Sequence, residues 1–475
     1  MPDDNEPRSE DVSLPVSKRS IATTIELPLF LNLLALSLTG PAISNIVLYK
    51  TCVHSLNYTV PQCKPFLSPI KTNETALLEK DVEKYSTYVS TVKLVLEYIF
   101  PAFLSLFLGA WSDTYGRKPL IVWPLFGASI TGMLLVIFSL MDSLGPWWYI
   151  LTAVPSSLSG GYIAMFTGMY CYVSDTSTPD STSLRMTMID ATTSLGIVIG
   201  SVLCTYFILT IGTTYLLLLA ATISVIAYSF SNIWIKESLS GALQGGGSKI
   251  LDLLLIKEMF NESLKERPNH QRTQIFLICI VSVNVILAYT GPLSVEYLYT
   301  RQKLQWSLQE YTTYSSFSTA LTLVGGFFGV LVVQKALRLG DIGFSIAVLI
   351  LIIANNMIKM FAVETWHMYL ACAMSIFRGL PGPLMRSYLT KILPVEDVGK
   401  VFVLLSTSES ICPVLFPLIF NPLYSYTLST FPGAIYALSS GLVFIAMILL
   451  GYVQYFSWLG SSTNYRRLDS VNEEN

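Results

Sequence analysis

The sequence predicts an all-α membrane protein with twelve transmembrane helices arranged in two six-helix halves. Hydrophobic residues make up 52% of the 475 residues and charged residues only 13%, whereas soluble globular proteins carry about 25% charged residues. The apolar residues gather in segments of about 20 residues, the length that crosses a bilayer as a helix. Lys and Arg are spread unevenly over the connections between these segments. This composition excludes a soluble enzyme and a disordered scaffold.

Twelve candidate transmembrane helices follow one another along the chain. Each is predominantly apolar and long enough to span the hydrocarbon core. A long charged loop separates the sixth from the seventh, so the layout is six helices, a loop and six helices. The segments are 20–47, 86–110, 119–141, 147–174, 184–209, 212–235, 273–298, 311–334, 341–363, 366–391, 401–425 and 432–458.

This layout divides the chain into five parts, two of which are the helical bundles. One polar loop within the first bundle, 51–85, contains N-glycosylation sequons at Asn57 and Asn73, which can be used only on a luminal or extracellular face. The parts are an N-terminal tail (1–19), a first bundle (20–235), a central loop (236–272), a second bundle (273–458) and a C-terminal tail (459–475).

The positions of Lys and Arg predict the orientation of the helices. If both termini lie in the cytosol, eighteen Lys and Arg residues fall in cytosolic segments and seven in outer segments. Cytosolic loops carry the excess of positive charge in membrane proteins. The sequons at Asn57 and Asn73 then lie outside, so charge and glycosylation predict the same topology.

A short motif follows the second predicted helix and reads Gly-Ala-Trp-Ser-Asp-Thr-Tyr-Gly-Arg-Lys-Pro. Its glycines permit a close helix approach and a tight turn, and its two basic residues anchor the loop on the cytosolic side. The motif resembles the signature of the major facilitator superfamily, in the loop where that family carries it. The alternative is an ordinary basic inner loop. The residues that carry the resemblance are Gly109, Asp113, Gly116, Arg117 and Lys118.

Other segments resemble solute carrier family 46, the proton-coupled folate transporter family. They are Glu26 to Leu31 continuing to Pro41, Tyr172 to Asp175, Arg185 to Asp190, and Pro381 to Lys391. The resemblance covers both halves of the chain. It implies the major facilitator fold and the import of anionic organic solutes, which in this family include folates carried with protons and peptidoglycan fragments.

The resemblance also implies roles for individual residues. Asp190 stands where the folate transporter has an acidic residue linked to proton coupling, and Arg386 where it has an arginine linked to substrate and proton binding. The sequence departs from that transporter at its coupling histidine, where Tyr289 and its neighbours stand. The outer loop between helices 7 and 8 has no cysteine, so the bridge that the family makes there is replaced, if one forms, by a pair between Cys52 and Cys63.

Charged residues within the apolar segments are candidate functional groups, because each costs about 2.5–3.5 kcal/mol on insertion scales. Asp190 and Arg386 lie near the cytosolic ends of their helices, as does Glu26, which we predict to share the proton-coupling role of Asp190. Arg378 and Glu409 lie near mid-helix and either pair with each other or bind a ligand.

The other charges have structural interpretations. Lys93 and Glu97 are spaced i, i+4 and are predicted to neutralise each other. Lys359 lies close enough to the outer end of its helix to extend to the membrane surface, and Glu296 is expected to be hydrated at the outer end of helix 7.

The tenth predicted helix is interrupted between two arginines, Arg378 and Arg386, by two glycines and two prolines. Such a break is tolerated at membrane depth only where protein or a water-filled cavity takes over the hydrogen bonds, and broken helices form the binding sites of transporters. The alternative is a packing kink. Two guanidinium groups beside a cavity suit a carboxylate or phosphate.

The sequence lacks the residues that other kinds of functional site require. The three histidines, His54, His270 and His367, fall in or beside loops, which argues against a metal site or a catalytic triad. The balance of 29 basic and 31 acidic residues provides no excess for binding nucleic acid. We therefore expect no enzyme activity, no cofactor and no metal.

The sequence thus predicts a secondary active transporter of a small organic anion, folate-like or muropeptide-like, coupled to protons and working by alternating access. Its partners are the anionic substrate, protons and the lipid bilayer. We assign substrate binding to Arg386, Arg378 and Glu409, and proton coupling to Asp190 and Glu26. The expected location is the plasma membrane or an endosome or lysosome. The alternative is a non-transporting receptor or scaffold with the same fold.

Overall fold

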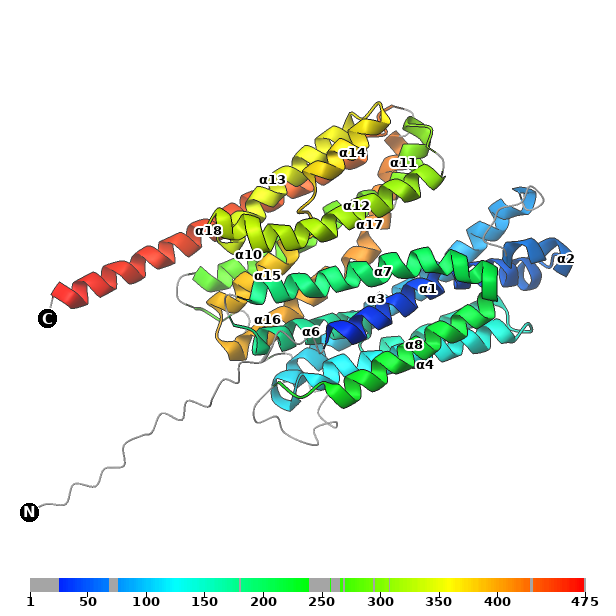
Figure 1. Cartoon of the computed structure of the whole chain (residues 1–475), viewed down its shortest axis with the longest axis horizontal. Coiled ribbons are helices and arrows are strands. Elements are labelled where there is room, and N and C mark those ends of the chain that lie inside the picture. The colour runs from blue at the N-terminus through cyan, green and yellow to red at the C-terminus, as the bar shows by residue number, and fades with distance from the viewer. Residues whose placement is uncertain are drawn as a thin grey trace, which may run out of the picture.

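The computed structural model of the chain is an elongated bundle of roughly parallel and antiparallel helices (Figure 1). It describes residues 25–67, 76–178, 181–238, 257, 265–267, 270–293, 295–306, 308–427 and 430–473. Every regular element in these ranges is helical. The predicted all-helical fold class is therefore confirmed.

The first group of helices, called here the N-terminal helices, precedes residue 238. Its long members begin and end at residues that leave short turns between them. The elements are α1 (Glu26–Lys50), α2 (Val60–Cys63), α3 (Ala76–Tyr115), α4 (Lys118–Leu140), α5 (Ala153–Leu158), α6 (Gly161–Thr176), α7 (Thr182–Ile211) and α8 (Thr213–Trp234).

The second group, the C-terminal helices, follows residue 270. Several of its members are short, because the chain is interrupted between them. The elements are α10 (Gln271–Leu293), α11 (Glu296–Lys303), α12 (Leu308–Phe328), α13 (Asp341–Met360), α14 (Thr365–Met374), α15 (Pro381–Ile392), α16 (Val395–Glu409), α17 (Cys412–Thr427) and α18 (Ala434–Glu473).

Ten helical segments in the described residues are long and apolar enough to cross a membrane. They correspond to predicted helices one to nine and twelve. The other two predicted helices, 366–391 and 401–425, are each broken into two shorter pieces. The chain is interrupted between α14 and α15 and again between α16 and α17.

Proline explains where the broken helices restart. Pro381 is the first residue of α15 and Pro413 the second residue of α17. Proline lacks the backbone N–H but suits the first helical turn, where that group would have no partner. Residues 375–380 and 410–411 are left outside regular helix, and both interruptions lie beside the central cavity described below.

Close packing within the N-terminal helices depends on small residues. α1 lies along α7 and α8. A Cβ added at Gly196 of α7 would stand 3.1 Å from the carbonyl oxygen of Phe30, and one at Gly200 would stand 2.7 Å from Ser37 Cβ. Small residues at such contacts allow membrane helices to approach closely.

Small side chains make several of the contacts between the two groups of helices. Ser105 of α3 hydrogen-bonds Thr407 of α16 at 3.2 Å, and Ser183 of α7 hydrogen-bonds Ser387 of α15 at 2.6 Å. Gly109 of α3 faces Val403 of α16, where an added Cβ would overlap the valine side chain. These contacts join the groups on the side of the α3–α4 connection.

Three boundaries differ from the prediction. α3 starts at Ala76, ten residues before the predicted helix, so the helical part extends into the polar loop 51–85. α18 continues to Glu473 and includes most of the predicted tail. Predicted helix 7 ends at Leu293, and Glu296 begins a separate short helix, α11.

Candidate functional site

A cavity of about 480 Å³ lies between the two groups of helices. Its wall combines α6 and α7 of the N-terminal helices with α10, α15 and α16 of the C-terminal helices. Its charged lining residues, within the described chain, are Asp190, Arg378, Arg386 and Glu409. All four were predicted from the sequence to be functional, and the fold brings them together around one space.

Asp190 and Arg386 belong to one network that crosses the cavity. The hydroxyl of Tyr170 on α6 donates a hydrogen bond to Asp190 on α7. Arg386 on α15 places its guanidinium carbon 4.4 Å from the centre of the Tyr170 ring, a cation–π contact. Tyr170 therefore touches both the acid of the N-terminal helices and the base of the C-terminal helices.

Arg386 is also the ion-pair partner of Glu409 on α16. The second oxygen of that carboxylate accepts a hydrogen bond from Ser282 on α10. Arg386 is 7% exposed, so its charge is largely removed from water and needs this partner. The sequence left open whether Glu409 pairs with Arg378; the structure pairs it with Arg386.

Arg378 stands apart from this network. It lies in the interruption between α14 and α15, and its guanidinium carbon is 5.0 Å from the centre of the Tyr289 ring. Among the described residues no carboxylate lies within ion-pair distance of Arg378, and its Nε has no hydrogen-bond partner. Arg378 is thus the cation that lines the cavity without an acidic partner.

Aromatic side chains form much of the remaining wall. They are Tyr98, Tyr162, Phe166, Tyr170 and Tyr289. Such rings offer flat apolar surfaces, and the tyrosines add hydroxyl groups. The roles of Tyr170 and Ser282 in this network could not be predicted from the sequence, because one tyrosine or serine in an apolar helix carries no distinguishing pattern.

Glu26 does not join the site. It occupies the first turn of α1, is 7% exposed, and is not among the residues that line the cavity. Its Oε2 has no hydrogen-bond partner among the residues that the structure describes. The structure therefore separates Glu26 from Asp190, although the sequence predicts the same proton-coupling role for both.

Two other ion pairs account for charges within the helices. Lys93 pairs with Glu97 along α3, as the spacing predicted. Lys359 Nζ lies 2.7 Å from Glu296 Oε1, with both side chains buried. The expectations that Lys359 extends to the membrane surface and that Glu296 is hydrated were wrong. The chain turns after Leu293, and this turn places Glu296 beside Lys359 of α13.

The predicted signature loop forms a compact polar cluster. Gly116, at φ 115°, ends α3 in a conformation that favours glycine. Arg117 Nε lies 3.4 Å from Asp175 Oδ2. The Glu237 carboxylate accepts hydrogen bonds from the backbone N–H groups of Arg117 and Lys118, at 2.7 and 3.1 Å, and so caps α4. The side chain of Asp113 lies outside the described residues.

A second cluster closes the start of α16. Asp397 accepts a hydrogen bond from Arg267 Nη2 at 3.0 Å and lies 3.2 Å from Lys265 Nζ. Burial alone would raise the pKa of this carboxyl, but the hydrogen bonds and charges of Arg267 and Lys265 outweigh it and lower the pKa below its ordinary value. Asp397 is therefore held in its ionised form.

The polar segment after α1 is held by a disulfide between Cys52 and Cys63. Asn57, between these cysteines, is exposed and adopts φ 55°. An exposed asparagine on a short cross-linked loop is sterically open to a glycan. Asn73, the other predicted glycosylation site, lies outside the described residues.

Sequence comparisons relate the chain to transporters. A model of the Major Facilitator Superfamily matches residues 29–417. A probable peptidoglycan muropeptide transporter from Drosophila melanogaster is 27% identical over 432 residues, covering 89% of this chain and 83% of its own. A lysosomal proton-coupled steroid conjugate and bile acid symporter from Gallus gallus is 23% identical, covering 92% and 95%. The proton-coupled folate transporter of Rattus norvegicus is 22% identical, covering 79% and 80%.

Solved structures show the same fold. The human organic anion transporter MFSD10 superimposes with a TM-score of 0.68 at 16% identity, covering 90% of this chain and 98% of its own. The fucose:proton symporter of E. coli gives 0.62 at 13% identity, covering 90% and 97%. At such identities the likeness concerns the arrangement of the helices.

Proposed function

Because the chain belongs to the Major Facilitator Superfamily, we propose that it is a secondary active transporter that carries a small organic anion together with a proton. The chain is a multi-pass membrane protein, and its resemblance to solute carrier family 46 is confirmed by the relatives named above. We propose twelve spans, the broken helices α14–α15 and α16–α17 supplying two of them, with both termini in the cytosol.

The charge balance of the cavity carries this proposal. Its two carboxylates, Asp190 and Glu409, equal in number its two guanidinium groups, Arg378 and Arg386. A monovalent anion entering alone leaves an uncompensated negative charge in a site that borders the membrane interior, which is costly. An anion that enters with one proton keeps the balance. The cavity thus favours movement of the two together.

The residues divide into an anion anchor and a proton acceptor. Arg378 has no acidic partner among the residues that the structure describes, and we take it as the first contact for the substrate anion. We propose Asp190 as the residue that takes up the proton; Arg386 is held by Glu409 until the proton reaches that carboxylate, after which its guanidinium is available to the substrate. This assigns Glu409 to the proton side of the exchange, whereas the sequence analysis placed it with the substrate.

The lining also suggests the kind of anion. Five aromatic side chains beside one unpaired cation suit an amphipathic molecule with an acidic group and a flat or apolar body. The relatives' names include muropeptide, steroid conjugate, bile acid and folate transport, and each such solute pairs an acidic group with a larger body. We propose a solute of this class, taken up at the plasma membrane or from an endosome or lysosome.

Uptake by the purified protein in liposomes tests the proposal. A labelled panel of folates, muropeptides, bile acids and dicarboxylates is offered with and without an inward proton gradient, at about pH 5.5 and about pH 7.5 outside. We expect saturable uptake of at least one anion, stimulated by the gradient and abolished by a protonophore. Binding of an anion without uptake or exchange would instead indicate a non-transporting receptor.

A further inference from the structure

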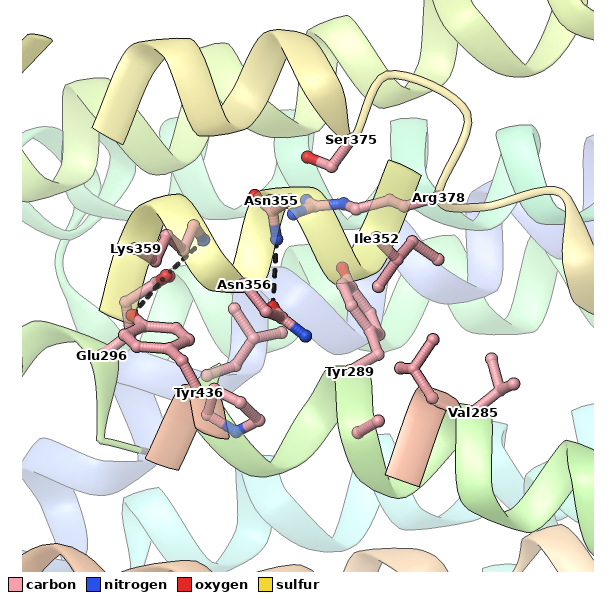
Figure 2. A pocket seen from close by; sticks show the side chains of 14 residues that line it. Val285, Tyr289, Glu296, Ile352, Asn355, Asn356, Lys359, Ser375, Arg378 and Tyr436 are labelled. Carbon is pink, nitrogen blue, oxygen red and sulfur yellow. Dashed lines mark hydrogen bonds and ion pairs between the residues drawn. The ribbon is translucent and has the colours of Figure 1, made fainter. Parts of the chain in front are cut away.

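A second, smaller pocket lies inside the C-terminal helices, beside the central cavity. It measures about 40 Å³ and is bordered by α10, α13, α18 and the interruption after α14. Figure 2 shows Glu296 and Lys359 paired at one end, Asn355 and Asn356 in the middle, and Arg378 reaching toward them from the other end. The rest of the wall is largely apolar.

The carboxylate of this pocket is already neutralised. Lys359 Nζ lies 2.7 Å from Glu296 Oε1, and the hydroxyl of Tyr436 donates to the same oxygen at 3.1 Å. Glu296 and Lys359 cancel, so Arg378 leaves the pocket with one net positive charge. Arg378 and Tyr289 line both this pocket and the central cavity.

The pocket also holds unused hydrogen-bond donors. Asn355 donates its Nδ2 to Asn356 Oδ1 at 3.1 Å, and this leaves Asn356 Nδ2 without a partner among the described residues. Asn356 is 5% exposed. Arg378 Nε is likewise unpartnered. A buried donor without a partner costs about 1–3 kcal/mol, so both groups favour a ligand that accepts hydrogen bonds.

We propose that this pocket binds a small monovalent inorganic anion, chloride under physiological conditions, between Arg378 and Asn356. The net positive charge and the unpaired donors each favour a halide over a cation. A volume of about 40 Å³ accommodates one such ion and a water molecule. That water can donate to Asn355 Oδ1, the unpaired acceptor beside Arg378.

Chloride in this pocket would weaken the binding of the transported anion, a consequence that rests on the proposed function. The two cavities share Arg378, so an anion on one side reduces the attraction of its guanidinium for an anion on the other. If the two anions exclude each other and chloride binds with a Kd of about 50 mM, about 150 mM chloride raises the apparent KM roughly fourfold.

Chloride binding is tested first on the purified protein, without any transport measurement. The melting temperature is recorded in chloride, bromide and gluconate at equal ionic strength. We expect chloride and bromide to raise it in a saturable manner, and bromide soaked into crystals to give an anomalous peak beside Arg378. Equal melting temperatures in chloride and gluconate would overturn the proposal.

Three variants test whether Asn356 is part of the chloride site. Asn356→Leu removes the donor, and Asn356→Asp replaces it with a repelling carboxylate at nearly the same size, so both are expected to lose the response to chloride. Asn284→Leu removes an amide of α10 that donates to Ile280 O and does not line the pocket, and should keep the response. A chloride response unchanged in Asn356→Asp would overturn the assignment even if Asn356→Leu failed to fold.

Uptake assays then test the link to the central cavity. Replacing chloride by gluconate should lower the apparent KM of the wild type about fourfold and leave that of Asn356→Asp unchanged. A chloride-sensitive melting temperature without any uptake would leave the anion site standing and refute the transport function. If chloride raises the melting temperature but does not change the KM for uptake, the proposed coupling through Arg378 is refuted.

Discussion

Arg386 on α15 pairs with Glu409 on α16 while its guanidinium covers the ring of Tyr170 on α6. One side chain therefore contacts a carboxylate of its own helix group and an aromatic residue of the opposite group. Tyr170 in turn donates to Asp190. A change in the protonation of either acid acts on one partner of the Arg386–Tyr170 contact, which joins the two groups.

Asp190→Asn should separate substrate movement from proton movement. The amide keeps the size of the carboxyl and can still accept the hydrogen bond from Tyr170, but it cannot bind a proton in this pH range. We expect exchange of labelled substrate across the membrane to persist and acid stimulation of net uptake to disappear. Acid stimulation equal to that of the wild type would move the proton site to Glu409.

Removing both members of the central ion pair should do less harm than removing one. Arg386→Ala leaves Glu409 buried without its partner and is expected to cost about 3–5 kcal/mol, whereas the double variant Arg386→Ala, Glu409→Ala removes both charges. Surface biotinylation and melting temperature should therefore be partly restored in the double variant. Equal losses in the single and double variants would show that the pair contributes nothing to folding.

Arg378→Lys should weaken substrate binding without weakening the fold. Lysine keeps the charge but loses the planar fork that grips a carboxylate, and loss of one charge-assisted hydrogen bond is worth about 1.5–3 kcal/mol, roughly 10-fold to 150-fold in affinity. Substrate concentration dependence, corrected for surface protein, measures this. Arg338→Lys, an exposed position outside the cavity, is the matched control. An unchanged KM would remove Arg378 from the binding site.

Asp397 should stabilise the protein across the physiological pH range. Its pKa is lower in the folded chain than in the unfolded chain, so its contribution is fully present above about pH 4 and is lost as the pH falls through the folded value. The difference in melting temperature between wild type and Asp397→Asn is expected to stay constant from about pH 7.5 to pH 5 and to shrink only below about pH 4. A difference that shrinks near pH 6 would contradict this.

Asn57 should carry a glycan. It is exposed and lies on the short loop closed by Cys52 and Cys63, and the predicted topology places it outside. Glycosidase treatment should increase gel mobility of the wild type, by less in Asn57→Gln, and not at all when Asn73→Gln is added. A shift that survives in the double variant would point to Asn261 and reverse the orientation proposed for the central loop.

Hydropathy predicted most of the fold, because a span needs a minimum length of apolar residues whatever its neighbours are. It also located the candidate site, since Asp190, Arg378, Arg386 and Glu409 stand out as charges in apolar segments and all four line one cavity. The glycines and prolines between Arg378 and Arg386 predicted a break in this helix; the structure places the break earlier, at residues 375–380, and α15 begins at Pro381.

The pairing of these charges could not be predicted from the sequence, because it depends on which faces of the helices pack against each other. Glu409 was equally close in depth to Arg378, yet the packing of α15 against α16 places it beside Arg386. The sequence predicts that Glu296, at the end of predicted helix 7, is hydrated. In the structure the chain turns after Leu293, and the Glu296 side chain pairs with Lys359. Tertiary contacts decided each case.

The hydroxyl pairs between the two groups of helices bear on the speed of the transport cycle. Ser183 and Ser387, and Ser105 and Thr407, are neutral partners, and water can replace each of them with little loss of hydrogen-bond energy. Ser183 also donates to Asp341 Oδ1 at 3.3 Å, but that carboxylate keeps its ion pair with Lys391, so separating the helices at these points leaves no charge unpaired. Electrostatic work at these points therefore adds little to the activation barrier for reorientation, and in the function that we propose turnover depends on the loading and release of the proton and the anion.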